Sequence, residues 1–301
     1  MITNVEFKKP VGLLLFLCLL DFSCEKKVPV QYLDDERPEL IPELYAEEVI
    51  NASKRFQQNL TLTADGSEHY FTETDAEEWR YLRILRVTQK EGEVLIDTPQ
   101  FVRDFQFENV HFIGEPMLSF DGERLLFIAD YPPNLWLSQR DASGNWKAPT
   151  KMSISTTKAD WYPSFQKDGS LLFTNGVAFI GKGESTIDKE ELALPTYPFD
   201  VRDPILSPEK DFIIVTRWKD QSEKETDLFV SFAQPDGSWG TLLDLGSDIN
   251  TDAYEFAPSL SPDGNYLFFS RRDQWQNAKA TNVYWVSMQV VETLRKPGTN
   301  R

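Results

Sequence analysis

Arginine, tryptophan and tyrosine lie beside acidic residues at several well-separated points of this 301-residue sequence, and these groups are the best candidates for chemistry. Arg can bind a carboxylate through two parallel hydrogen bonds, and Arg, Trp and Tyr dominate the energetics of binding interfaces. They predict a ligand-binding surface, unless the charges only pair with one another along a solvated rim. The candidate residues are Trp161, Tyr162, Arg202, Asp203, Arg217, Trp218, Glu255, Arg271 and Arg272.

Catalytic motifs are missing from the sequence, which has no GxSxG, no P-loop, no GxGxxG after a strand and no CxxC. Its two histidines, His69 and His111, lack the HExxH spacing of a zinc site and are expected to be structural. We therefore expect no metal and no cofactor, and non-enzymatic binding is favoured. The alternative is a glycan-active hydrolase or lyase that uses carboxylates such as Asp203 and Glu255 as acid and base.

The composition is that of a folded, β-rich domain with an acidic surface. Hydrophobic residues make up 41% of the chain and aromatic residues 13%, which favours pleated and half-buried strands. The net charge of −17 argues against nucleic acid as a partner, because binding a phosphate backbone needs a basic surface. A protein, peptide or glycan of the cell envelope is the expected partner.

The first residues predict export. Two lysines precede an apolar run of ten residues, Val11–Leu20, which is too short to span a bilayer. The following LDFSC resembles a bacterial lipoprotein signal, which implies cleavage before Cys24 and lipidation of its thiol. Ordinary secretion and an uncleaved anchor are the alternatives. The expected organisation is a signal peptide at 1–23, a tether at 24–43, a β domain at 44–294 and a tail at 295–301, with the membrane reached through the lipid only.

A repeated unit sets the architecture. APSLSPDGNYLFFS, which begins at Ala257, has counterparts that begin near Leu60, Glu115, Tyr162 and Asp203. The equivalent positions 65, 121, 168, 209 and 263 are 56, 47, 41 and 54 residues apart, with a mean of (263−65)/4 = 49.5. Each copy predicts a hairpin in which Asp-Gly supplies the positive φ of a tight turn. The fourth copy has Glu209-Lys210 there, so its turn is expected to be longer or strained.

Further strands follow each hairpin, as in NLWLSQ, DLFVSF and NVYWVS, so each repeat contains about four strands. These Pro-Asp-Gly hairpins, with the stretch INTDAYEFAPSLSPDGNYLFFSRRD, resemble the WD40-like repeats of TolB-type β-propellers, which are common in periplasmic and outer-membrane lipoproteins. The resemblance implies an all-β propeller of five, alternatively six, four-stranded antiparallel blades that serves as a binding scaffold. The segment at 44–50 is expected to supply the last blade's outer strand and close the ring.

Strand order in such a blade predicts where the candidate residues gather. Each inner strand begins on one face of the ring, which we call the start face, and ends at the Asp-Gly turn on the opposite face, the turn face. Residues before each repeat's Pro and residues after its second strand therefore share the start face. Besides the candidates above, this set contains Glu115, Asp130, Tyr131, Asp160, Tyr254 and Asp273.

Overall fold

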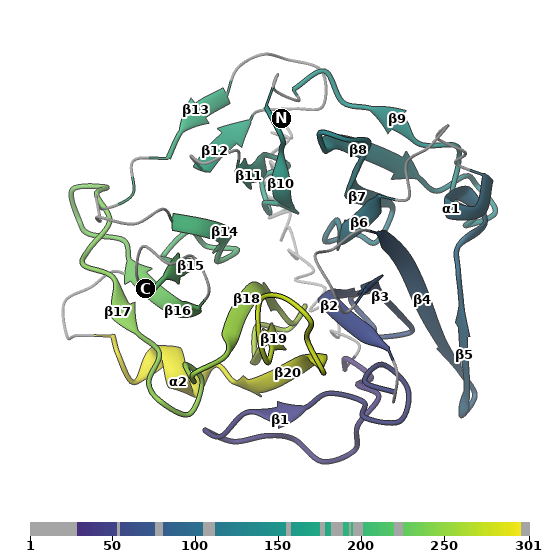
Figure 1. Ribbon diagram of the computed structural model, residues 1–301. Helices are drawn as coiled ribbons and strands as arrows, with labels where there is room; N and C mark the ends of the chain where they lie inside the picture. Colours follow the sequence, from purple (N-terminus) through teal and green to yellow (C-terminus); the bar gives the residue numbers. More distant parts are fainter. Residues whose placement is uncertain are drawn as a thin grey trace, which may run out of the picture.

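The computed structural model describes residues 29–52, 55–75, 81–104, 112–154, 158–174, 178–181, 189–192, 194, 201–219 and 225–295. Over these residues the chain forms short strands arranged in a ring (Figure 1), with two helices of one turn, α1 (Gln100–Asp104) and α2 (Gln289–Glu292). Three sheets have four antiparallel strands each. They contain β2 (Phe56–Leu62), β3 (Glu68–Thr74), β4 (Leu82–Lys90) and β5 (Glu93–Asp97); β6 (Ile113–Leu118), β7 (Arg124–Ala129), β8 (Asn134–Gln139) and β9 (Thr150–Lys151); and β10 (Trp161–Phe165), β11 (Leu171–Thr174), β12 (Ala178–Gly181) and β13 (Lys189–Glu191).

The remaining sheet contains two groups of four strands that are joined by one parallel pair, Thr226 with Tyr254. One group is β14 (Val201–Leu206), β15 (Phe212–Trp218), β16 (Thr226–Phe232) and β17 (Leu243–Asp244). The other is β18 (Tyr254–Leu260), β19 (Tyr266–Arg272), β20 (Thr281–Ser287) and β1 (Glu43–Leu44). Because β1 pairs with β20, the first described strand completes the last group, as expected, although it begins at Glu43.

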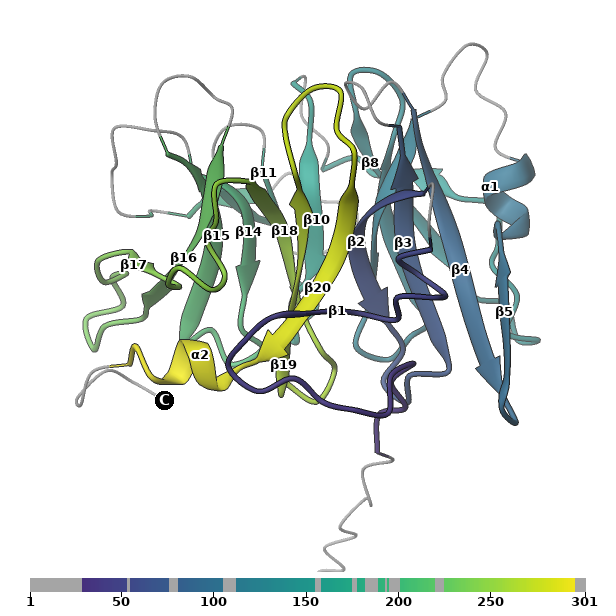
Figure 2. The same cartoon turned by 60° about the horizontal axis from the view of Figure 1, so that its bottom comes forward.

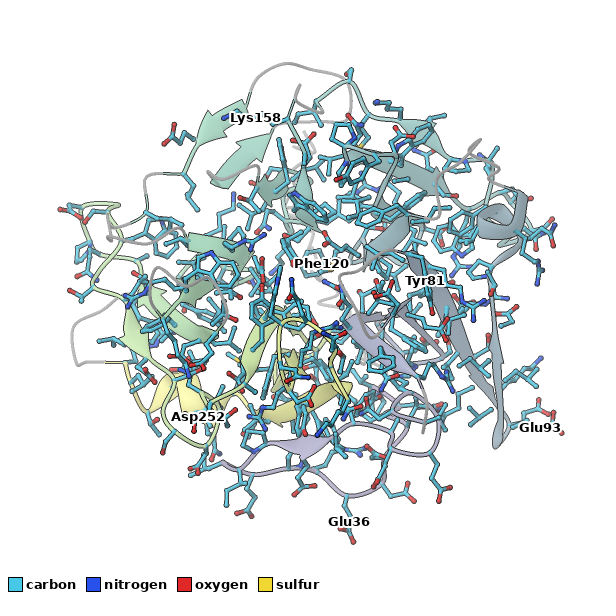
Figure 3. The ribbon with its side chains drawn as sticks, in the orientation of Figure 1. Glu36, Tyr81, Glu93, Phe120, Lys158 and Asp252 are labelled. Carbon is cyan, nitrogen blue, oxygen red and sulfur yellow. The ribbon has the colours of Figure 1, made fainter. Side chains whose placement is uncertain are left out.

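The apolar runs of the repeats form the buried second strands. In β7, Leu125 to Ala129 are all fully buried, and the same holds for Leu171 to Phe173 in β11. Large side chains fill the space between neighbouring groups, for example Phe71, Phe268 and Trp285 between the last group and the first. In Figure 3 side chains occupy the middle of the ring, whereas the labelled Glu36 and Glu93 lie at its rim.

The Asp-Gly turns differ from the expected two-residue hairpin, because only their glycine has positive φ. In the turn at 119–124, the Gly122 amide donates to the Ser119 carbonyl (2.8 Å), and the Asp121 carboxylate accepts from the Glu123 amide (3.0 Å). Lys210 takes the place of the glycine in the fourth copy at φ 58°, and its amide donates to the Ser207 carbonyl in the same way (2.9 Å). That turn is therefore strained but no longer than the others.

Residues 29–43, which were expected to belong to a tether, pack on the turn face. The Gln31 amide donates to the Asp65 carbonyl (2.8 Å), and the Tyr32 hydroxyl donates to Asp263 (2.8 Å). Tyr32 is buried against the ring of Trp285, with 5.5 Å between ring centroids. Any free tether is thus confined to residues before Pro29. At the other end, Arg295 of the expected tail is ion-paired with Asp211 (2.9 Å).

Candidate functional site

Each inner strand is interrupted at the same place by a bulge whose central residue has a left-handed backbone. The pairing register shifts there in all five inner strands. Residues other than Gly rarely adopt positive φ, and such strain concentrates at functional sites. The left-handed residues are Asn59, Glu115, Tyr162, Asp203 and Ala257, with φ between 48° and 54°. Each of the last four precedes a proline. Proline fits at a bulge because it has no amide hydrogen to donate to the ladder of the strand.

Side chains of neighbouring strand groups satisfy the amides that the bulges release. The Tyr162 amide donates to Oε2 of Glu115 (2.6 Å), and the Ala257 amide donates to Oδ2 of Asp203 (3.1 Å). Thr72 accepts in the same way from the Glu115 amide (2.8 Å). The bulges and their prolines surround the axis of the ring and leave a channel of only about 20 Å³. The centre is therefore closed to anything larger than about one water molecule.

Both of these buried carboxyl groups, Glu115 and Asp203, have raised pKa values. Burial, helped by the charge of Asp203, raises the pKa of Glu115 to about 8, against the opposing effects of the Tyr162 amide and Arg202. Burial also raises the pKa of Asp203 to about 6, against the opposing effect of Arg202. At neutral pH Glu115 is therefore mainly protonated and Asp203 mainly ionised.

A cavity of about 240 Å³ opens on the start face, directly above the closed channel. Aromatic side chains form most of its wall. The rings of Phe112 and Trp161 meet edge to face at 5.7 Å, and those of Tyr254 and Trp275 are 5.1 Å apart. Tyr131 is 79% exposed at the mouth. The lining residues are Gln58, Leu82, Phe112, Glu115, Tyr131, Trp161, Tyr162, Arg202, Tyr254 and Trp275.

Arg202 brings a positive charge into this aromatic cavity. Its guanidinium lies 5.2 Å from the ring centroid of Trp218, which is buried behind it against Trp275. The Arg202 side chain makes no hydrogen bond or ion pair with any residue that the structure describes. Because an Arg side chain stays charged and offers five donors, its guanidinium is free to meet an anionic group from outside.

Three of the nine candidates, Trp161, Tyr162 and Arg202, line the cavity. Asp203 lies below it at the channel, and Trp218 supports Arg202 from behind. Arg202 pairs with Thr216 near the start of β14, and Arg271 pairs with Glu255 near the start of β18, whereas the turns lie where these strands end. The arginines and the turns are therefore at opposite ends of the strands. This confirms the expected separation of the two faces.

The other candidate arginines have structural contacts. Arg271 forms an ion pair with the buried carboxylate of Glu255 (2.8 Å) and donates to the Ile249 carbonyl (2.8 Å). Arg272 is fully buried and donates to the carbonyls of Trp275 (3.2 Å) and Asp75 (3.1 Å). Through these bonds Arg272 positions the loop that carries Trp275, which rises above the start face between β19 and β20 in Figure 2. Arg217 lies over the ring of Phe229, at 4.6 Å from its centroid.

Sequence reasoning missed Gln58, Leu82, Phe112 and Trp275 as lining residues. Trp275 closely follows Arg271-Arg272-Asp273, which the sequence placed on the start face, and this closeness was the one local indication that Trp275 belongs to the site.

His69 is buried in β3 and shares a hydrogen bond with the Tyr45 hydroxyl (2.7 Å), in keeping with a structural role. Burial lowers the pKa of His69 to about 3. His111 and Cys24 lie outside the described residues. Within the described ranges, no three His, Cys, Asp or Glu side chains are grouped to hold a metal ion, and no helix is long and apolar enough to cross a membrane.

Comparisons with known proteins identify structures but no sequence family. No protein-family model matches the chain, and a search of curated proteins finds no match. TolB from Acinetobacter baumannii is similar in structure, with 16% identity, 78% of this chain and 58% of that chain covered, and a TM-score of 0.45. A puromycin-hydrolyzing peptidase of Mycobacterium tuberculosis has 14% identity, 76% and 34% coverage, and a TM-score of 0.42. The chain thus spans 58% and 34% of these two structures.

An endo-arabinase from Bacteroides thetaiotaomicron aligns over 84% of this chain and 99% of its own, with 11% identity and a TM-score of 0.51. At this identity the likeness shows the fold alone. Together with the ring of four-stranded antiparallel sheets, it identifies the fold of this chain as an all-β propeller.

Proposed function

We propose that this chain is a non-enzymatic binding scaffold of the bacterial cell envelope, a TolB-like propeller of five blades that holds a protein, peptide or glycan partner in the cavity of its start face. One observation carries the proposal. Arg202 is half-buried among aromatic walls, and its guanidinium makes no hydrogen bond or ion pair with a described residue, although the nearby charge of Asp203 acts on it. A half-buried guanidinium whose donors are not used by the fold is suited to an anionic ligand.

The five blades in this proposal are the three separate sheets and the two groups of the fourth, each with one Pro-Asp-Gly repeat or its variant. Lipidation of Cys24 would tether the propeller through the residues that follow it. Since the segment from Pro29 packs on the turn face, the anchor would hold that face toward the membrane. The cavity would then face away from the membrane, open to a partner in the periplasm or at the cell surface.

Capture of the partner from envelope extract tests the proposal. The full-length protein is immobilised, and the bound fraction is compared with that of Arg202→Ala and Trp161→Ala. Arg103→Ala is the matched control, because Arg103 lies on α1 at the rim and Gln100 is its one side-chain hydrogen-bond partner among the described residues. Loss of one and the same partner in both cavity variants, with retention by the control, supports the proposal. Equal capture by all four proteins would refute it.

Glycan cleavage is the second candidate function, and the buried carboxyl groups favour it. Glu115 is protonated and Asp203 ionised at neutral pH, which is the division of roles that acid and base catalysis needs. The pair expected from the sequence was Asp203 with Glu255, but Glu255 is held by Arg271 and Thr251. Release of reducing ends from envelope polysaccharides, abolished in Glu115→Gln, would establish cleavage in place of a scaffold.

A further inference from the structure

The cavity of the start face is a dead end. Below it, the bulges at Glu115, Tyr162, Asp203 and Ala257 close the axis to about 20 Å³. A channel with room for about one water molecule lets no polymer pass through the ring, so the cavity is suited to the end of a chain or to a small molecule. The volume of about 240 Å³ is below the range of roughly 300 to 1,000 Å³ that drug-sized ligands need, and it suits a single terminal residue.

Charge selects which end of a chain is accepted. Among the described lining residues, Arg202 alone carries a positive charge, and its guanidinium is backed by the ring of Trp218. Glu115, the one carboxyl group in that described set, accepts a hydrogen bond from the Tyr162 amide. A terminal carboxylate matches the fork of a guanidinium through two parallel hydrogen bonds. A terminal ammonium group would instead be repelled by Arg202.

The walls favour an apolar side chain over a sugar ring. Leu82 and Phe112 are buried, and Trp161, Tyr254 and Trp275 present aromatic surface. A pyranose carries several hydroxyl groups, and each loses free energy if it is buried without a partner. Besides Arg202, the described polar groups of the lining are Gln58, the tyrosine hydroxyls and Glu115, and Glu115 is already engaged. A terminal amino acid needs partners only for its carboxylate and one amide.

We infer that the cavity binds the C-terminal residue of a polypeptide, with its carboxylate on Arg202 and an apolar last side chain against Phe112, Trp161 and Trp275. This inference rests on the proposed function and names its ligand class. The partner would thus be a protein with an exposed and apolar C-terminus.

Titration with matched small peptides tests the inference on the full-length protein. The probes are the tripeptide Ala-Ala-Leu as free acid, the same peptide as C-terminal amide, and D-glucuronate. Trp161 and Trp275 line the cavity, so intrinsic tryptophan fluorescence reports binding, and calorimetry checks it. We expect the free acid to bind ~10- to 100-fold more tightly than the amide, because amidation removes the charge-assisted hydrogen bonds.

Variants separate recognition by the guanidinium from simple charge. Arg202→Gln should abolish the preference for the free acid, Arg202→Lys should keep part of it, and Trp239→Phe, which is not among the described lining residues, should change nothing. Equal affinity for acid and amide in the unmodified protein would overturn the inference, whether or not the variants fold. Binding of glucuronate but of neither peptide would also overturn it while leaving the proposed scaffold intact. If capture of the envelope partner also fails to depend on the cavity, the proposed function fails as well.

Discussion

The backbone amide of Tyr162 donates a 2.6 Å hydrogen bond to Oε2 of Glu115, and this bond joins the inner strands of two adjacent sheets. Both residues have a left-handed backbone, which is why the amide leaves its own ladder and points at the neighbouring sheet. Asp203 and Ala257 repeat the arrangement between the two groups of the last sheet. The closed floor of the cavity thus depends on carboxyl groups buried beneath it.

Glu115→Gln should flatten the pH dependence of stability above pH 6.5. The folded protein holds a proton on Glu115 up to a pKa of about 8, whereas the unfolded chain releases it near the ordinary value of 4.5. The unfolded state therefore binds fewer protons in this window, and the free energy of unfolding falls as the pH rises through it. The loss is at most about 2 kcal/mol between pH 6.5 and 8, and Gln removes it while keeping an acceptor for Tyr162.

Urea unfolding at pH 6.5, 7, 7.5 and 8 measures this effect. The raised pKa of Asp203, about 6, changes stability mainly below this window, and the contribution of His69, whose pKa is lowered from 6.5 to about 3, is the same in both proteins and cancels in the comparison. Parallel curves for the two proteins would show that Glu115 is ionised in the folded state.

Arg271→Ala should destabilise the fold far more than Arg202→Ala. Removal of Arg271 leaves the fully buried carboxylate of Glu255 without its ion-pair partner, which costs about 3 to 5 kcal/mol. Arg202 forms no ion pair with a described residue, so its removal should cost within about 1 kcal/mol. Thermal unfolding of the two variants side by side checks this, and melting temperatures that fall together would mean that Arg202 is structural too.

Gly66→Ala and Gly264→Ala form a matched pair that tests docking of the N-terminal segment. Both glycines have φ of 75°, so each substitution has the same backbone strain, about 1 kcal/mol. A Cβ at Gly264 meets nothing within 4 Å, but one at Gly66 would lie 1.9 Å from the carbonyl oxygen of Gln31. Gly66→Ala should therefore cost at least ~1 kcal/mol more and expose the segment around Tyr32 to protease. Equal stability and equal cleavage would mean that residues 29–33 do not rest on this turn.

Cys24→Ser tests the proposed lipid anchor. The thiol is the expected site of acylation, so its loss should move the protein from the membrane fraction to the soluble fraction. Fractionation followed by detection of the protein in each fraction measures this. Continued sedimentation with membranes would rule out Cys24 as the anchor.

Local features of the sequence predicted most of the fold. Pro, Asp-Gly and the apolar run that follows are close together in each repeat, so the hairpins at Asp121 and Asp263 could be placed without knowledge of the rest. Pairing of β1 with β20 also followed, because the last group lacked an outer strand. The bulges could not be predicted, because Glu115, Tyr162 and Ala257 are not residue types that favour positive φ.

The site was harder to predict because its contacts are long-range. Arg272 and Asp75 are 197 residues apart, and nothing near Arg272 in the sequence indicates that it is buried rather than exposed. The sequence correctly placed the arginines on one face, since this depends only on strand order. It could not separate Arg202, which faces a cavity, from Arg271, which is held by Glu255, because that difference lies in the packing of neighbouring strands.

Photo-crosslinking from the mouth of the cavity is the most direct test of the central claim that the start face binds a partner. A benzophenone amino acid at Tyr131, which is 79% exposed, is compared in living cells with one at Glu93, which lies at the rim in Figure 3. We predict a single crosslinked partner from position 131, none from position 93, and loss of the adduct when Arg202→Gln is added. Absence of an adduct at 131, or an adduct unchanged by Arg202→Gln, would contradict the account.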